Sequence, residues 1–201
     1  MYIIRLIAYT IYQALPAQRE NPLLRQMGYL YILSGIANIT WLFLWHYEIF
    51  PLTLLVMLSL LSLLIAIYVQ LGFGRQEVSA AFRWLVQLPF SVYLGWITVA
   101  TIANTTQLLD FLNWNGWGVR PEIWAMIMLI VVALLTGVML LTRSDIAYGL
   151  VIIWAVVGIA LKHAGTSEVS TTSWVVGGLV ALLTTVQFVR TNSSRPSQLL
   201  I

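Results

Sequence analysis

FPLTLLVMLSLLSLLIAIYVQLG, residues 50–72, is almost entirely apolar and contains no charged side chain. A helix needs about 20 such residues to cross the hydrocarbon core of a bilayer. A second stretch, IWAMIMLIVVALLTGVMLLT at 123–142, meets the same requirement. Because both runs are continuously apolar rather than alternating, they favour membrane helices over the strands of a β-barrel.

The composition of the whole chain agrees with these two stretches. Of its 201 residues 60% are hydrophobic and 8% are charged, and the mean hydropathy is +0.90. Soluble domains carry roughly 25% charged residues, so this chain lacks the charge to cover a surface that faces water. We therefore predict an all-α integral membrane protein, a polytopic helical bundle.

Two further counts narrow the function. The chain has no cysteine, which excludes disulfides, thiolate catalysis and cysteine-ligated metals. Its net charge is +3 and its pI is about 9.4. In a membrane protein such an excess reports on topology before it reports on nucleic acid, so we expect no nucleic-acid partner.

Seven hydrophobic segments are predicted, at roughly 2–15, 29–47, 50–72, 84–109, 122–142, 146–162 and 172–189. The first is short and carries Arg5. We expect residues 1–109 to form one helical bundle and residues 110–201 to add further membrane helices and a polar C-terminal tail. The connection at 110–121, with two tryptophans and two glycines, is expected to be an ordered cap at the membrane interface.

Basic residues are unevenly distributed between the connections. The loops that follow the first, third, fifth and seventh segments hold most of them: Arg19, Arg25, Arg75, Arg83, Arg143, Arg190 and Arg195. The other side has Arg120 and Lys162, with Arg5 near the N-terminus. The positive-inside rule therefore places the first group, and the C-terminus, in the cytoplasm.

The segment 84–109 carries more polar and aromatic side chains than a membrane crossing requires. Residues three or four apart share a helix face, and the stripe of this segment consists of Tyr93, Trp96, Ala100 and Asn104, with Thr101 beside it. The segment 29–47 carries a comparable pair, Asn38 and Trp41. Such residues either form hydrogen bonds between packed membrane helices or line a pocket with aromatic walls and a few polar groups.

The same residues resemble the TspO/MBR family, the tryptophan-rich sensory proteins and translocator proteins. The last helix of that family has Tyr, then Trp, then Ala-Thr, then Asn, and here the matching residues are Tyr93, Trp96, Ala100, Thr101 and Asn104. Asn38 and Trp41 match the family's N-x-x-W helix. IYQALPAQRENP, residues 11–22, is similar to the end of the family's second helix. The resemblance covers roughly residues 1–109, where the segment 50–72 takes the place of the fourth helix.

The sequence departs from the family pattern at several points. Pro89 lies four residues before Tyr93 instead of directly before it, and Ser34 replaces a glutamine. The segment 50–72 lacks an acidic residue that is common in the fourth helix. The family's first helix has no counterpart, and three further segments, 122–189, follow the last one that matches.

The resemblance implies a ligand and a location. It implies that Tyr93, Trp96, Ala100, Thr101, Asn104, Asn38 and Trp41 bind a tetrapyrrole, porphyrin or haem, or a sterol-like molecule, in a pocket between helices. The protein would then act as a sensor or carrier, and Trp96 matches a position linked to porphyrin breakdown by light. We expect membrane lipid as a partner, together with either a second copy of the chain or a larger membrane complex. We expect the location to be the inner cell membrane.

Other functions are weaker or stay open. The alternative is a structural or assembly subunit of a larger membrane complex without ligand chemistry of its own. We expect no metal site, because His46 and His163 are lone histidines at segment ends. A retinal protein needs a lysine in the last helix, whereas Lys162 ends the sixth segment. The acidic residues lie at segment ends or in loops, so no carboxylate pair supports catalysis or proton coupling.

Overall fold

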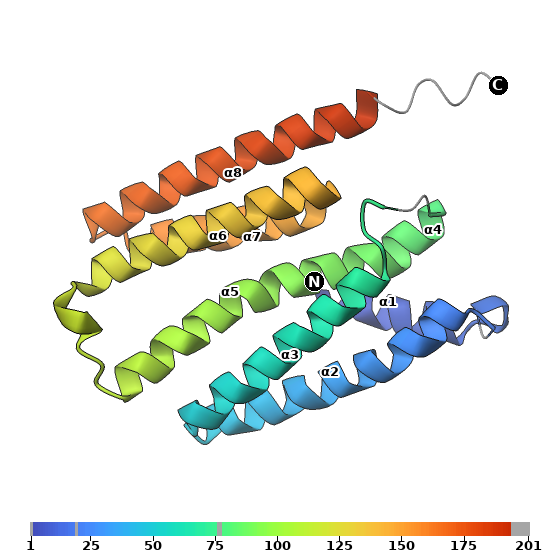
Figure 1. Cartoon of the computed structure of the whole chain (residues 1–201), viewed down its shortest axis with the longest axis horizontal. Helices are drawn as coiled ribbons and strands as arrows, with labels where there is room; N and C mark the ends of the chain where they lie inside the picture. The colour runs from blue at the N-terminus through green and yellow to red at the C-terminus, as the bar shows by residue number, and fades with distance from the viewer. Residues whose placement is uncertain (1, 19, 76–77, 194–201) are drawn as a thin grey trace. The chain divides into compact units, whose positions relative to one another are not determined.

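The computed structural model describes residues 2–18, 20–75 and 78–193, without the side chains of the second, third and fifth residues. In these ranges all the regular structure is helical (Figure 1). The helices are α1 (Tyr2–Ala14), η1 (Pro16–Gln18), α2 (Pro22–His46), α3 (Phe50–Gln70), α4 (Ala80–Phe82), η2 (Arg83–Gln87), α5 (Leu88–Phe111), η3 (Gly116–Gly118), α6 (Pro121–Arg143), α7 (Ile146–Lys162) and α8 (Ser167–Ser193).

Five helical stretches are long and apolar enough to cross a membrane. They are α2, α3, the continuous stretch Ala80–Phe111 that contains α4, η2 and α5, then α6 and α8. α7 is a shorter apolar helix of 17 residues, and α1 has 13 residues. The prediction of an all-α, polytopic membrane protein is confirmed, and every predicted segment lies on a helix.

Two helices extend beyond the predicted apolar segments because polar residues can begin them. Asn21 caps α2, where its Oδ1 accepts hydrogen bonds from the backbone N–H groups of Leu23 and Leu24. Pro22 occupies the first helical position, which needs no N–H donor. α2 therefore starts well before residue 29. In the same way α8 starts at Ser167 and takes in the polar run SEVSTTS.

The helices form two compact units, Met1–Trp114 (unit 1) and Asn115–Ile201 (unit 2). In unit 1, α3 packs against both α2 and α5, and α1 packs against α5. α3 buries one side of its surface, with Met57, Leu60 and Leu64 among the least exposed residues. α3 is therefore the central helix of this unit.

The start of the α5 stretch in unit 1 is irregular. Residues Arg83–Gln87 form a π-helical turn directly before Leu88 and Pro89, the first two residues of α5. The turn brings the amide of Gln87 to the end of α3, where its Nε2 donates to the carbonyl of Leu71 at 3.1 Å. Leu71 lacks a helical partner for that carbonyl, so the bond satisfies a buried acceptor.

Unit 2 is a packed group of three helices, in which α8 contacts α6 and α7. Gly149 of α7 allows a close approach, because a Cβ there would lie 2.7 Å from Thr184 Oγ1 of α8. Gln187 donates through Nε2 to Ser144 Oγ at 2.7 Å, and Arg120 forms an exposed salt bridge of 3.0 Å with Glu168.

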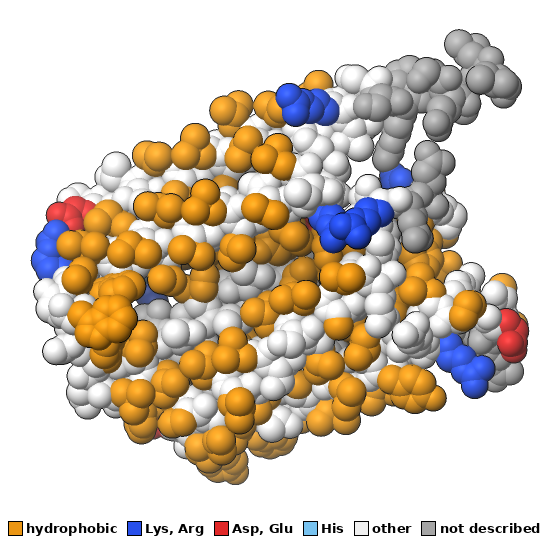
Figure 2. All heavy atoms as spheres, in the orientation of Figure 1, with side chains coloured by type: hydrophobic (Ala, Val, Ile, Leu, Met, Phe, Trp, Pro, Cys, Tyr) orange, Lys and Arg blue, Asp and Glu red, His pale blue; other side chains and the backbone are white. Residues whose placement is uncertain are grey.

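The outer surface is largely apolar. Figure 2 shows hydrophobic side chains along the lengths of the helices, with charged side chains mostly toward their ends. Large exposed residues include Ile32, Leu42, Leu134, Leu141 and Leu182. A water-soluble protein rarely exposes such continuous apolar surface, and lipid is the solvent that suits it.

Candidate functional site

The α5 stripe runs from the buried side of its helix to an exposed margin. Tyr93 and Asn104 are buried, at 3% and 2% exposure. Ala100 and Thr101 are half-buried, and Trp96 is 37% exposed. The threonine hydroxyl donates to the carbonyl of Ile97 within the helix at 2.7 Å. Trp96 therefore offers an accessible indole next to the small Ala100.

Asn104 is joined to α3, the helix between it and most of α2. Thr53 Oγ1 lies 3.1 Å from Asn104 Oδ1 and 2.7 Å from the carbonyl oxygen of Phe50. One hydroxyl proton cannot serve both acceptors well. If the amide turns over, its nitrogen donates to Thr53 while the hydroxyl donates to Phe50.

In either orientation one polar atom of the Asn104 amide lacks a partner. As placed, it is Nδ2, which is buried and has no hydrogen bond among the described residues. An unsatisfied buried polar group costs about 1–3 kcal/mol. Asn104 is therefore a buried polar group with unused hydrogen-bonding capacity inside a helix long and apolar enough to span a membrane.

Asn38 and Trp41 are half-buried on α2. The Trp41 ring lies 5.6 Å from that of Trp45, which in turn meets Phe50 of α3 at 5.5 Å. Trp41 Nε1 is buried and has no hydrogen-bond partner within the described part of the chain. A second unsatisfied donor thus occurs on the helix that the sequence pairs with the α5 stripe.

α2 and α5 meet at an aromatic cluster that the sequence did not single out. The rings of Tyr9, Tyr31 and Phe90, from α1, α2 and α5, contact one another edge to face, with centroids 4.9–5.7 Å apart. Tyr9 is fully buried, and its hydroxyl has no partner among the described residues. Phe90 lies three residues before Tyr93, so a helical count from the stripe could have found this contact.

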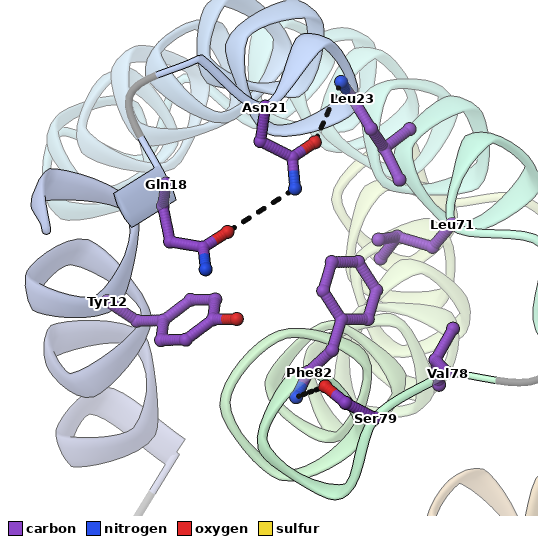
Figure 3. A pocket seen from close by; sticks show the side chains of 8 residues that line it. All are labelled: Tyr12, Gln18, Asn21, Leu23, Leu71, Val78, Ser79 and Phe82. Carbon is purple, nitrogen blue, oxygen red and sulfur yellow. Dashed lines mark hydrogen bonds between the residues drawn. The ribbon is translucent and has the colours of Figure 1, made fainter. Parts of the chain in front are cut away.

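Unit 1 also contains a partly polar hollow at the end where α1 connects to α2 and α3 connects to α4 (Figure 3). Its volume is about 310 Å³ and it is lined by Tyr12, Gln18, Asn21, Leu23, Leu71, Val78, Ser79 and Phe82. The Tyr12 phenol, the Gln18 amide and the Phe82 ring point toward the same space. Because Gln18 and Asn21 line one hollow together with Val78 and Ser79, the described parts of the first and third loops lie at the same end of the unit.

Local hydrogen bonds shape this hollow. Asn21 Nδ2 donates to Gln18 Oε1 at 3.3 Å, while Asn21 Oδ1 caps α2. Ser79 Oγ accepts from the backbone N–H of Phe82 at 3.2 Å and so starts α4. A smaller hollow of about 220 Å³ shares Gln18 and is lined further by Gln13, Leu24, Arg25 and Gly28. Neither hollow is lined by a residue of the α5 stripe, by Asn38 or by Trp41.

The first connection of unit 2 is ordered by tryptophan. Trp124 Nε1 donates to the carbonyl of Gly116 at 3.1 Å, and the backbone N–H of Trp117 donates to Asn115 Oδ1 at 3.0 Å. The Trp117 side chain is 77% exposed. This arrangement agrees with the expected cap, and an exposed indole at a helix end is typical of the membrane interface.

A family model described as TSPO-like protein matches residues 1–186. The chain belongs to the TSPO-like protein family. The match continues through α6, α7 and most of α8, whereas the motifs that resemble the family in the sequence end at Asn104.

Two other comparisons gave no match. Neither the curated proteins nor the solved structures include one that matches the chain. Membership of the TSPO-like family is therefore supported by the family model together with the residues of the α5 stripe. It establishes a TspO-type integral membrane protein.

Proposed function

We propose that this TSPO-like protein binds a tetrapyrrole, or a flat hydrophobic molecule of similar shape, against the α5 stripe, and that it acts as a sensor or carrier. The observation that carries the proposal is the combination on one helix of an accessible indole, Trp96, and a buried amide with spare hydrogen-bonding capacity, Asn104. Family membership makes a TspO-type ligand the first chemistry to test.

The residues divide into two roles. Trp96, Ala100 and Thr101 form the accessible wall, because an aromatic face next to a small residue suits offset stacking of a flat ring system. In this proposal Tyr93 and Asn104 of α5, with Asn38 and Trp41 of α2, supply polar groups that fix the orientation of the ligand. Entry of the ligand requires the wall to part from its neighbours, since Tyr93 and Asn104 are closed to the outside.

The proposal also assigns the ligand site to one part of the chain and the protein to one membrane. We assign the ligand site to the TspO-like part, residues 1–109, and treat residues 110–201 as additional membrane helices and tail. The positive-inside pattern and family membership are consistent with the inner cell membrane. The proposal also includes sterol-like molecules as ligands and a second copy of the chain as a partner.

A titration with protoporphyrin IX tests the proposal. The purified protein in lipid nanodiscs should show saturable quenching of tryptophan fluorescence and a shifted porphyrin absorption band. Non-specific uptake of porphyrin by the lipid does not saturate, and a titration of empty nanodiscs measures it. Partitioning without saturation would refute the proposal and favour the alternative, a structural or assembly subunit of a larger membrane complex.

A further inference from the structure

The small hollow next to Gly28 has the features of an anion site at the end of unit 1. It is formed by Gln13 of α1, Gln18 of η1, and Leu24, Arg25 and Gly28 of α2. Arg25 is its one charged lining residue among those described, and it makes no ion pair within the described part of the chain. A guanidinium with two neighbouring amides presents several N–H donors, which suits a phosphate group.

The backbone N–H groups nearest the hollow, at the start of α2, are already paired. The N–H groups of Leu23 and Leu24 are occupied by Asn21, and the N–H of Arg25 bonds to the Asn21 carbonyl. The positive end of the α2 dipole still favours a negative charge nearby. An anion here would therefore be held by the Arg25 guanidinium and by the side-chain amides.

The glycine leaves room for the ligand. A Cβ built on Gly28 meets no atom within 4 Å, so the wall of the hollow is open at this position. Through Gln18 the hollow adjoins the larger one, whose described lining is uncharged and combines the Tyr12 hydroxyl with the Leu71 and Phe82 side chains. A charged compartment beside an uncharged, partly apolar one matches the two parts of a phosphate ester of an alcohol.

We propose that these two hollows form a second binding site, for a phosphate monoester or diester, separate from the α5 stripe. The phosphate lies in the Gly28 hollow against Arg25, and the uncharged part of the ester lies in the Phe82 hollow. Its position where membrane helices end, beside loops rich in arginine, suits the headgroup of an anionic lipid. A soluble phosphate ester would be recognised by the same groups.

Native mass spectrometry of the protein released from mixed micelles tests the site. With phosphatidylglycerol and phosphatidylcholine in equal amounts, the protein should retain phosphatidylglycerol preferentially. Arg25→Gln should lower that preference about fivefold, the factor expected for one arginine at a headgroup. Arg190→Gln removes one arginine at the end of α8 and should leave the preference unchanged. An equal loss in both variants would overturn the proposal, because charge alone would then explain retention.

A pair of glycine variants tests the hollow without changing charge. Gly28→Leu fills the open wall and should abolish the preference, whereas Gly35→Leu, on the same helix and equally open, should not. Leucine favours a helix over glycine, so both variants should fold. Unchanged retention in Gly28→Leu would contradict the proposal.

Glycerol 3-phosphate then distinguishes the two sources of phosphate. Displacement of the retained lipid at millimolar concentration would assign the site to soluble esters, and resistance to displacement would assign it to lipid. Protoporphyrin titration of Gly28→Leu should match that of the parent, so failure of this site and failure of the α5 site give different results.

Discussion

Thr53 Oγ1 on α3 lies 3.1 Å from Asn104 Oδ1 on α5, a buried hydrogen bond between two membrane helices. The partner of Asn104 is thus on the helix that lies between α2 and most of α5. The same amide keeps one atom unpaired. This arrangement stabilises the packing of α3 on α5 and leaves a polar group available to a ligand.

A double-mutant cycle should measure this bond. Thr53→Val, Asn104→Ala and the double variant are compared by reversible unfolding in mixed micelles. Interhelical hydrogen bonds in membranes average about 0.6 kcal/mol, so we expect a coupling energy of that size. A coupling energy indistinguishable from zero would show that the two side chains do not interact in the bilayer.

Unit 2 should be sensitive to a single methyl group at Gly149. The new Cβ of Gly149→Ala would lie 2.7 Å from Thr184 Oγ1 and 3.2 Å from Leu140 Cδ2, so either the Thr184 side chain must turn or α7 and α8 must separate. Overpacking of this kind costs about 1–3 kcal/mol of unfolding free energy. Thermal unfolding in detergent measures the change.

Gly158→Ala is the matched control on α7, because nothing lies within 4 Å of its new Cβ. It should be neutral or should stabilise the helix by up to about 1 kcal/mol. The double variant Gly149→Ala with Thr184→Ala should recover most of the loss. Equal effects of the two glycine variants would refute the close approach of α7 and α8.

The sequence predicts where the helices lie better than it predicts which helices pack against one another. Continuous apolar runs identify every membrane helix, because hydrophobicity over about 20 residues decides insertion. The polar starts of α2 and α8 were missed, since capping by Asn21 and a polar first turn do not depend on hydrophobicity. The two units and the central place of α3 follow from packing between distant segments, which no local pattern contains.

The candidate site shows the same division. Helical periodicity puts Tyr93, Trp96 and Asn104 on one stripe of α5, but it does not predict that Tyr93 and Asn104 are buried while Trp96 lies at the exposed margin. It does not name Thr53 as the partner of Asn104, because that pairing depends on the register of two helices. The two hollows at Gln18 form where the ends of helices and their connections come together, and in the sequence only the polar run PAQRENP hints at them.

Membrane topology can be tested by cysteine labelling, since the chain has no cysteine of its own. Arg75→Cys and Asn115→Cys place single thiols at exposed positions of two connections. The excess of arginine in the loops after α1 and α3 predicts that position 75 is cytoplasmic. An impermeant maleimide added to intact cells should label position 115 alone, and labelling of position 75 alone would reverse the orientation.

Trp96 should contribute to ligand affinity through its ring face. Stacking of aromatic systems is worth about 0.5–1.5 kcal/mol, so Trp96→Ala should weaken protoporphyrin binding by roughly two- to tenfold. Trp96→Phe should retain most of the affinity, while any light-dependent loss of porphyrin absorbance that the family resemblance implies should slow without the indole. Trp154→Phe, an exposed tryptophan of unit 2, is the control. Equal affinities of Trp96→Ala and the parent would place the ligand elsewhere.

The most direct test of the ligand site is a protoporphyrin fluorescence titration of Ala100→Leu in nanodiscs. A leucine there fills the gap beside Trp96 and suits a helix well, so the fold should survive. Ala133→Leu, a half-buried alanine in α6, is the matched control. We predict that Ala100→Leu loses saturable binding while Ala133→Leu binds like the parent. Binding by Ala100→Leu with the affinity of the parent would contradict a ligand on the α5 stripe and would make that stripe a seam for helix packing.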